Sequence, residues 1–264
     1  MPQPLVMGVL NVTPDSFSDG GRWLDADAAV AHGLAMAAEG ADVVDVGGES
    51  TRPGAEPVAE DEELRRVLPV VEALAPHVRV SVDTRRRGVA EKAVAAGATL
   101  VNDVSASLWP VAAAAGAGVG WVAMHMRGEP RTMQRAPEYH DVVAEVRAFL
   151  VDRASTARDA GVEEVWIDPG IGFGKTAAHN LALLRSLRSL AGAGWPVLVG
   201  ASRKTFLGVV TAEPPGGPVV PADDRLEASL AVAVWAADQG AAMVRVHDVR
   251  PTVHALQLVA GLAS

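Results

Sequence analysis

The sequence predicts an α/β fold, a single (β/α)8 TIM barrel that spans residues 1–264 as one domain. Eight short apolar runs recur along the chain, and stretches rich in Ala, Leu, Glu and Arg separate them. A strand followed by a helix, repeated eight times, is the pattern of a closed parallel barrel. The length of 264 residues also suits one such barrel, which takes about 250 residues.

The apolar runs are nearly free of polar residues, as expected for strands that are covered on both faces. In chain order they are residues 6–10, 42–46, 78–82, 99–101, 121–124, 165–167, 196–199 and 243–244. Most of them lead into a polar side chain, such as Asn11, Asp83, Asn102, His125 or Asp168. Parallel barrels carry their active sites at the carboxyl ends of the strands, so we expect the site there.

The helices between the strands show amphipathic spacing and start signals. Residues 60–74 place apolar side chains at intervals of three and four, although Pro69 within them is expected to kink or break the helix. Asp224 and Glu227 have the spacing of a capping box and predict a helix start at that point.

Composition narrows the classes of function. The formal net charge of -9 argues against a nucleic-acid partner, because such proteins need a basic face. The absence of cysteine excludes disulfides and thiolate metal sites. Residues 1–4 lead almost directly into the first strand, and no apolar stretch is long enough to read as a membrane span. We therefore expect a soluble, cytoplasmic protein.

Three polar strand ends suggest a ligand pocket. Asp83, Asn102 and Asp168 end the third, fourth and sixth strands. Carboxylates and amides at a barrel mouth can recognise a heterocycle with adjacent N–H donors and a carbonyl. Capping of the following helix explains any one of them equally well. The three together favour the pocket.

Cations gather at the same end of the predicted barrel. They are Arg52, Lys204, Arg245 and His247. Strand alternation turns Val246 toward the helices, so Arg245 and His247 share the barrel-side face. Such a cluster suits a phosphate or pyrophosphate. The alternative is that these cations are exposed to solvent on the rim of the barrel. This fits Arg203 and Arg250, but it does not fit Arg245, which stands in an apolar strand.

Two further patterns are weaker. Residues 170–176 look like a nucleotide P-loop, but Pro169 stands where a glycine is required. We interpret them as a tight turn with Phe173 as a stacking wall and Lys175 at the surface. His125 fits a site residue or a hydrogen-bonded structural histidine. Asn11 near Asp83 would suit Mg²⁺, which prefers oxygen ligands and substrate phosphates.

Eight blocks, in order along the whole chain, carry a family resemblance. They are residues 10–21 (LNVTPDSFSDGG), 45–54 (DVGGESTRPG), 81–84 (SVDT), 102–105 (NDVS), 124–126 (MHM), 168–175 (DPGIGFGK), 202–204 (SRK) and 245–248 (RVHD). With these blocks the chain resembles the dihydropteroate synthase family. The first two and the SRK block are highly specific.

The resemblance implies a homodimeric transferase of folate biosynthesis and a target of sulfonamides. Members of the family join 4-aminobenzoate to 6-hydroxymethyl-7,8-dihydropterin diphosphate and release pyrophosphate, with Mg²⁺. The implied pterin residues are Asp83, Asn102, Asp168, Phe173 and Lys204. The implied 4-aminobenzoate residues are Phe17, Thr51, Arg52, Pro53 and Ser202. Asn11, Arg245 and His247 would hold pyrophosphate, Asn11 with Asp83 would hold the metal, and Arg52, Lys204 and Asp19 would be catalytic.

The chain departs from the family pattern in one place. Where the family usually shows Gly-Gly after the NDVS block, residues 106–109 read ASLW, which puts the shape of the fourth loop in question. Residues 50–54 of the second loop are intact, unlike those of sulfonamide-insensitive relatives. Two rival interpretations stand: a pterin-dependent methyltransferase, which would not need Thr51 and Arg52, and a non-catalytic paralogue, which would lose Arg52 and the Arg203–Lys204 pair.

Overall fold

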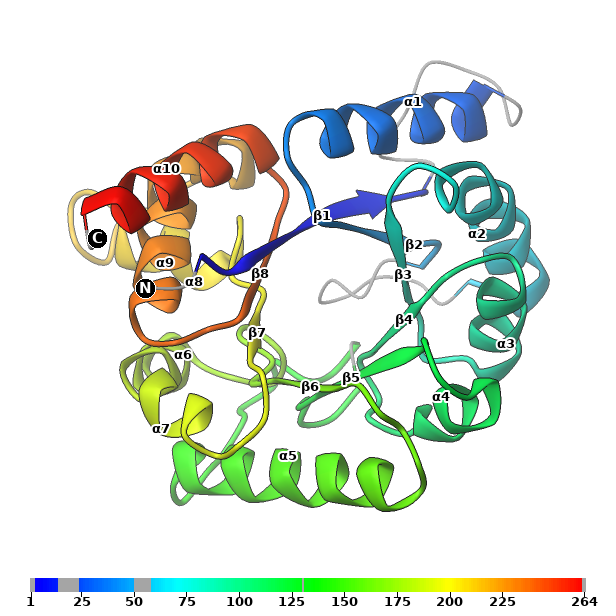
Figure 1. Ribbon diagram of the computed structural model, residues 1–264. Coiled ribbons are helices and arrows are strands. Elements are labelled where there is room, and N and C mark those ends of the chain that lie inside the picture. Colours follow the sequence, from blue (N-terminus) through cyan, green and yellow to red (C-terminus); the bar gives the residue numbers. More distant parts are fainter. Residues whose placement is uncertain (1–2, 14–23, 50–57, 130, 263–264) are drawn as a thin grey trace.

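Eight parallel strands form one sheet in the computed structural model, which describes residues 3–13, 24–49, 58–129 and 131–262. The strand order is β6-β5-β4-β3-β2-β1-β8-β7. An isolated bridge between Ile167 and Val197 joins β6 to the residue before β7, so the sheet is a nearly closed barrel. Helices surround this ring on its outer side (Figure 1). The predicted barrel is confirmed.

The strands are short and follow the predicted apolar runs. Their bounds are β1 Leu5–Asn11, β2 Val43–Gly47, β3 Arg79–Asp83, β4 Leu100–Asp103, β5 Gly120–Met124, β6 Val165–Asp168, β7 Leu198–Val199 and β8 Met243–Val246. The helices are α1 Leu24–Ala38, α2 Glu60–Leu74, α3 Arg87–Ala95, α4 Trp109–Ala115, α5 Val142–Asp159, α6 Ala177–Arg185, α7 Leu187–Ala191, α8 Thr205–Val210, α9 Leu226–Asp238 and α10 Val249–Leu262. Each strand is thus followed by at least one helix.

Two helix predictions were compared with the structure. Helix α2 continues through Pro69 to Leu74, with buried residues on both sides of the proline, so the proline does not break the helix. Helix α9 begins after a 3-10 turn over Ala222–Asp224, and its N-cap residue Arg225 makes no side-chain cap hydrogen bond. The predicted capping box at Asp224 is therefore wrong.

The interior of the barrel changes character along its axis. At the amino ends of the strands, inward side chains form an apolar cluster of Met7, Val43, Leu100, Val122, Trp166, Leu198 and Met243. Strand alternation then brings polar side chains into the same interior one step further along. These include Asp45, Asn102 and Asp168, all buried, and Arg245. The barrel is apolar at one end and charged at the other.

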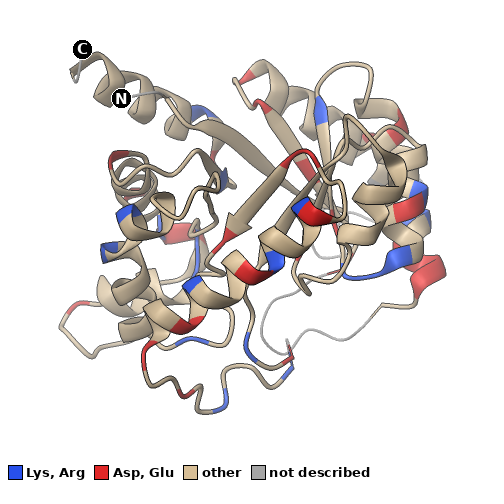
Figure 2. Ribbon diagram, turned by 60° about the horizontal axis from the view of Figure 1, so that its bottom comes forward, with Lys and Arg blue, Asp and Glu red and all other residues tan. Residues whose placement is uncertain are grey.

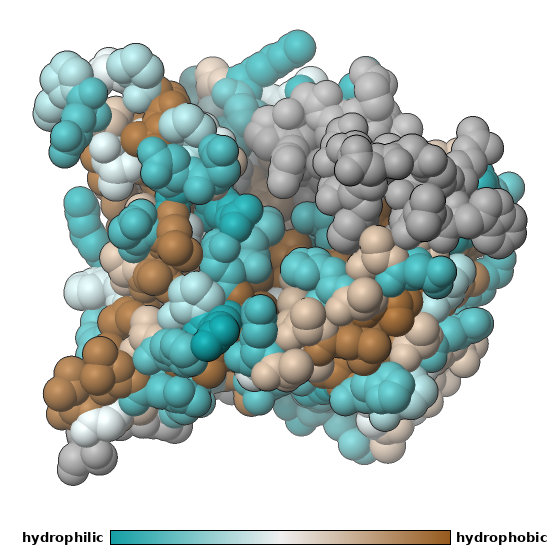
Figure 3. All heavy atoms as spheres, turned by 90° about the horizontal axis from the view of Figure 1, so that it is seen from above, coloured by the Kyte–Doolittle hydropathy of each residue, from teal (hydrophilic) through white to brown (hydrophobic). Residues whose placement is uncertain are grey.

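The outer surface mixes charges of both signs. Figure 2 shows acidic and basic residues interspersed along the outer helices, with no separate basic face on the described part of the chain. In Figure 3, hydrophilic residues surround smaller groups of hydrophobic ones. None of the helices within the described ranges is long and apolar enough to span a membrane.

Candidate active site

The ends of β1 to β4 place three polar side chains on one level of the barrel. Asn11 pairs in register with Gly47, Gly47 with Asp83, and Asp83 with Asn102. Gly47 leaves a gap, since a Cβ atom there would lie 3.5 Å from the Asp83 Cβ and 3.8 Å from the Asn11 Oδ1. Asn11 and Asp83 therefore flank an open position at the barrel mouth.

Arg245 on β8 reaches across the barrel to two carboxylates. Its Nε donates to Asp45 Oδ2 at 2.6 Å, and its Nη2 donates to Asp83 Oδ2 at 2.7 Å. Asn102 Nδ2 donates to the same Asp45 oxygen at 2.8 Å. Asp45 was not predicted as a site residue, because it stands inside an apolar run. The alternation of β2, with Val44 and Val46 outward, could have indicated it.

Burial sets the electrostatics of this group. It raises the pKa of Asp83 to about 7, although the Arg245 guanidinium opposes the shift, while Asp45 and Glu63 add to it. For Arg245 the two carboxylates outweigh burial and keep the guanidinium pKa above its usual value. Asp45 Oδ1, Asp83 Oδ1 and Ser81 Oγ are buried without a hydrogen-bond partner among the described residues. The group keeps acceptor oxygens available for a ligand.

Asp168 at the end of β6 faces the same interior. Its Oδ1 accepts a hydrogen bond from Gly170 N at 2.7 Å and so stabilises the following turn. The next helix, α6, is capped by Thr176, so the alternative that Asp168 caps this helix is wrong. A Cβ on Gly200 would lie 4.0 Å from the Asp168 Oδ2 and 3.6 Å from the Arg245 Cβ, so the glycine leaves room for about one carbon atom beside that oxygen. Burial raises the Asp168 pKa, and Lys204 and the Gly170 hydrogen bond oppose the shift.

Lys204 crosses the site from the loop after β7. Its ammonium donates to Ile171 O and lies 4.2 Å above the centre of the Phe173 ring. Burial lowers the Lys204 pKa to about 7, against the opposing charge of Asp168. One face of Phe173, predicted as a stacking wall, therefore already contacts a cation.

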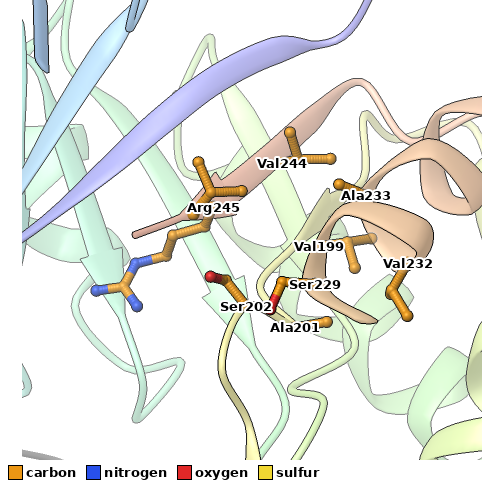
Figure 4. A pocket seen from close by; sticks show the side chains of 9 residues that line it. Val199, Ala201, Ser202, Ser229, Val232, Ala233, Val244 and Arg245 are labelled. Atoms are coloured by element: carbon orange, nitrogen blue, oxygen red, sulfur yellow. The ribbon is translucent and has the colours of Figure 1, made fainter. Parts of the chain in front are cut away.

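Ser202 and His247 meet on the neighbouring strand ends. The His247 backbone N and Nδ1 lie 3.2 and 3.1 Å from Ser202 Oγ. Beside Ser202 a pocket of about 10 Å³ opens between β7, β8 and α9, and the guanidinium of Arg245 points away from it (Figure 4). That volume holds about one water molecule, so this pocket is not a substrate site. Arg203 pairs with Asp248 and is 38% exposed, as its rim interpretation predicts.

Lys175 contradicts its prediction as a surface residue. It is 3% exposed, and its Nζ lies within hydrogen-bond distance of His125 Nδ1 and of the carbonyl oxygens of His125, Gly170 and Phe173. The sequence misled because a lysine at the end of a glycine-rich segment usually faces solvent. His125, 8% exposed, has the hydrogen-bonded structural role given as its second interpretation.

Hydrogen bonds to the Asp103 side chain stabilise the fourth loop, in which the Gly-Gly of the family is absent. The Asp103 carboxylate accepts hydrogen bonds from Ser105, from the backbone of Ser107 and Leu108, and from Trp121 Nε1. Ala106 takes a left-handed backbone conformation with φ of 50°. The Asp103 carboxylate, which was not singled out from the sequence, holds the turn in which Ala106 takes this conformation.

The role of Arg86 beside the second loop was not predicted from the sequence. Arg86 donates to Glu49 Oε2 at 3.1 Å, to Glu63 and to Val58 O, so it joins both sides of residues 50–57. The predicted residues Phe17, Asp19, Thr51, Arg52 and Pro53 lie outside the described residues. Asn11, Asp83, Asn102, Asp168, Phe173, Ser202, Lys204, Arg245 and His247 all lie at the carboxyl end of the barrel.

Comparison with known proteins agrees with this arrangement. Residues 7–247 match the family model described as pterin binding enzyme. A dihydropteroate synthase from Mycobacterium leprae (strain TN) is 53% identical over 261 residues, which cover 96% of this chain and 92% of the relative.

Two solved structures of the Xanthomonas albilineans dihydropteroate synthase are similar over 100% of this chain. One, solved with 4-aminobenzoic acid, has a TM-score of 0.90, 46% identity and 94% of its own chain covered. The other, in complex with 7,8-dihydropteroate, has a TM-score of 0.87, 44% identity and 95% covered. The chain belongs to the dihydropteroate synthase family of pterin-binding enzymes.

Proposed function

We propose that the chain joins 4-aminobenzoate to 6-hydroxymethyl-7,8-dihydropterin diphosphate, giving 7,8-dihydropteroate and pyrophosphate. The observation that carries this function is the meeting of buried acceptors and cations at one end of the barrel. Asp83, Asn102 and Asp168 stand there with Lys204 and Arg245. Such a set offers acceptors to a heterocycle and positive charge to a diphosphate.

The pterin is bound by the acceptor side of the site. Asp168 Oδ2, beside the gap left by Gly200, accepts hydrogen bonds from the pterin amino group and ring N–H. The Asn102 amide and Asp83 face the opposite edge of the ring, while Lys204 lies over Phe173. Desolvation in this buried place strengthens each hydrogen bond to a charged group.

The leaving group is bound by the cationic side. The methylene–oxygen bond breaks, its electron pair leaves with pyrophosphate, and Arg245, His247 and Asn11 stabilise the developing charge. The electron-rich dihydropterin stabilises the positive methylene. Ser202, Phe17, Thr51, Arg52 and Pro53 hold 4-aminobenzoate. Its amino nitrogen then bonds to the methylene carbon that lost pyrophosphate, and the nitrogen loses a proton to solvent. Asp19 and Arg52 are the catalytic residues that act once both substrates are bound.

Asn11 and Asp83 would hold Mg²⁺. Both side chains flank the gap at Gly47, and Asp83 Oδ1 lacks a partner among the described residues. These are oxygen donors, which Mg²⁺ prefers. Two protein ligands suit a metal completed by substrate phosphates, in keeping with the lack of any group of three His, Asp or Glu around one point in the described ranges. The bound ion would absorb charge on the leaving pyrophosphate.

We propose that the chain forms a homodimer, as the family resemblance implies, and works in the cytoplasm. Exposed apolar side chains on and near α8 and α9 support a contact surface: Val209, Val210, Val219 and Trp235. Light scattering tests the assembly. Val210→Glu should yield monomers, while Leu34→Glu on α1 should leave the dimer intact.

One assay tests the reaction and its rivals. Pyrophosphate release from the pterin diphosphate should require both 4-aminobenzoate and Mg²⁺, stop with a chelator, and be inhibited by a sulfonamide that competes with 4-aminobenzoate. A methyltransferase would release no pyrophosphate, and a binding paralogue would hold a pterin without turnover. Arg52→Ala should leave pterin affinity and thermal stability near parent values while turnover collapses. Parent turnover in this variant would make Arg52 only a rim charge.

A further inference from the structure

We propose that Lys175 is a positioning residue for the pterin site, because its ammonium group joins the end of β5 to the loop that carries Asp168 and Phe173. This role rests on the pterin reaction proposed above. Lys175 lies behind the wall of the site, 3% exposed, and acts through that wall. It differs in this respect from Lys204, which crosses the site itself.

The contacts of Lys175 bridge two segments that are 45 residues or more apart in the sequence. Its Nζ lies 3.0 Å from His125 Nδ1 and 3.1 Å from His125 O at the end of β5. On the other side it lies 3.0 Å from both Gly170 O and Phe173 O. Four acceptors surround a group with three protons, so the ammonium is held from both segments at once.

The protonation state of His125 fits this contact. Burial, and to a smaller extent the charge of the neighbouring Lys175, lowers the pKa of its imidazole to about 3. The ring is therefore neutral near pH 7. A neutral ring facing an ammonium must accept through Nδ1, which places its proton on Nε2.

The loop after β6 packs so closely on β5 that it depends on this bridge. A Cβ on Gly170 would come within 1.9 Å of His125 O, and one on Gly174 within 2.2 Å of Arg127 O. Without Lys175, carbonyl oxygens at His125, Gly170 and Phe173 would face one another with no donor between them. The loop would shift, and Phe173 and the Ile171 carbonyl would move away from Lys204.

Lys175 also acts on Asp168 through its charge. Asp168 faces Lys204 from the loop after β7, Arg245 from β8, the backbone N–H of Gly170, and Lys175 behind it, all of which lower its pKa against burial. Burial lowers the pKa of Lys175 itself to about 7, so it is charged on the acid side of neutrality. Removing that charge should raise the Asp168 pKa.

The decisive variant is Lys175→Gln, which keeps two N–H donors and removes the charge. Calorimetry with 6-hydroxymethylpterin should show affinity about tenfold weaker or worse, the usual effect of losing hydrogen bonds to a charged group. The acid limit of binding should move to higher pH, because Asp168 must stay ionised to accept from the pterin. The KM for 4-aminobenzoate should stay near the parent value.

Matched variants separate positioning from general loss of stability. Lys92→Gln, at an exposed lysine of α3, should change neither affinity nor the pH limit. Leu256→Ala in α10 should lower the melting temperature without moving the pH limit. If Lys175→Gln fails to fold, His125→Leu, which removes the side-chain acceptor of Lys175, should weaken pterin binding in the same direction by less.

Parent affinity and a parent acid limit in a folded Lys175→Gln protein would overturn the positioning role, and so would an unchanged affinity in His125→Leu. Failure of the reaction itself gives a different result. In that case the unsubstituted protein would release no pyrophosphate, whereas binding of 6-hydroxymethylpterin would still report on Lys175.

Discussion

The two ends of the barrel interior use the same strands for different purposes. At the amino ends, Met7, Leu100 and Trp166 belong to one apolar cluster. One step further along the same strands, Asp45 and Asp168 lie in the interior with the guanidinium of Arg245. Alternation is identical at both ends, so geometry alone does not distinguish them. Only the residue types do.

The difference shows where stability and reactivity reside. The apolar end buries Met7, Leu100, Trp166 and their neighbours in one hydrophobic cluster. At the charged end two carboxylates share the Arg245 guanidinium, and the pKa of Asp83 rises to about 7 because burial outweighs that pairing. Buried charges cost free energy unless they are fully paired. We infer that the charged end is arranged for its ligands, and the apolar end for the fold.

The largest expected effect comes from Arg245→Met. The variant leaves Asp45 and Asp83 buried without their cation, so the free energy of unfolding should fall by about 3 to 5 kcal/mol. Turnover should fall by about a thousandfold, because the guanidinium that stabilises the negative charge on the leaving pyrophosphate is lost. Chemical denaturation and pyrophosphate release measure the two effects. Arg250→Met, at an exposed position of α10, is the control, and equal behaviour of both variants would refute the assigned role.

Trp166→Ala tests the apolar end. Loss of this buried ring, which also donates to Glu164 at 2.7 Å, should lower the free energy of unfolding by about 3 to 5 kcal/mol. Pterin affinity, measured by calorimetry well below the melting temperature, should stay near the parent value. A large loss of affinity in the folded variant would show that the two ends are not separable.

Asp168→Asn tests the charged end alone. Replacing one carboxylate oxygen by an amide donor sets it against the pterin N–H groups. Pterin binding should weaken by about 2 to 5 kcal/mol, as calorimetry can measure. Asp159→Asn, at the exposed end of α5, should leave binding unchanged. Asp168 does not belong to the pterin site if its folded variant binds as well as this control.

The smallest expected effect concerns acid stability. The folded state lowers the His125 pKa to about 3 from its ordinary value of 6.5. Between these values the unfolded chain takes up a proton that the folded protein does not, so stability falls as pH falls. By pH 5 this costs about 2 kcal/mol. His125→Leu should lose correspondingly less stability between pH 7 and pH 5 in urea titrations, and an unchanged pH dependence would contradict the buried neutral ring.

The sequence predicted the barrel and the strand-end residues because both follow from local repetition. An apolar run of four or five residues that leads into Asn102 or Asp168 places that residue at the carboxyl end wherever the helices pack. Strand alternation likewise turned Arg245 inward in the prediction, and the structure confirms that direction.

The partners of these residues could not be predicted in this way. Asp45 accepts from Arg245, which is 200 positions away, and closing of the barrel brings them together. Lys175 looked like a surface residue because the depth of its loop depends on the packing of Gly170 against His125. Asp103 stabilises a loop whose usual glycine is replaced by Ala106. Each of these is a long-range or loop effect without a short sequence pattern.

The ring of strands has one weak join. Seven neighbouring pairs share continuous ladders, whereas β6 meets β7 through the isolated bridge at Ile167 and Val197. A place with few interstrand hydrogen bonds opens at low free energy, so backbone amides there should exchange with deuterium before those of β1 to β5. The segment carrying Ser202 and Lys204 follows directly from β7. Local opening between β6 and β7 would therefore move Ser202 and Lys204, while the continuous ladders of the other strands keep the remaining site residues in place.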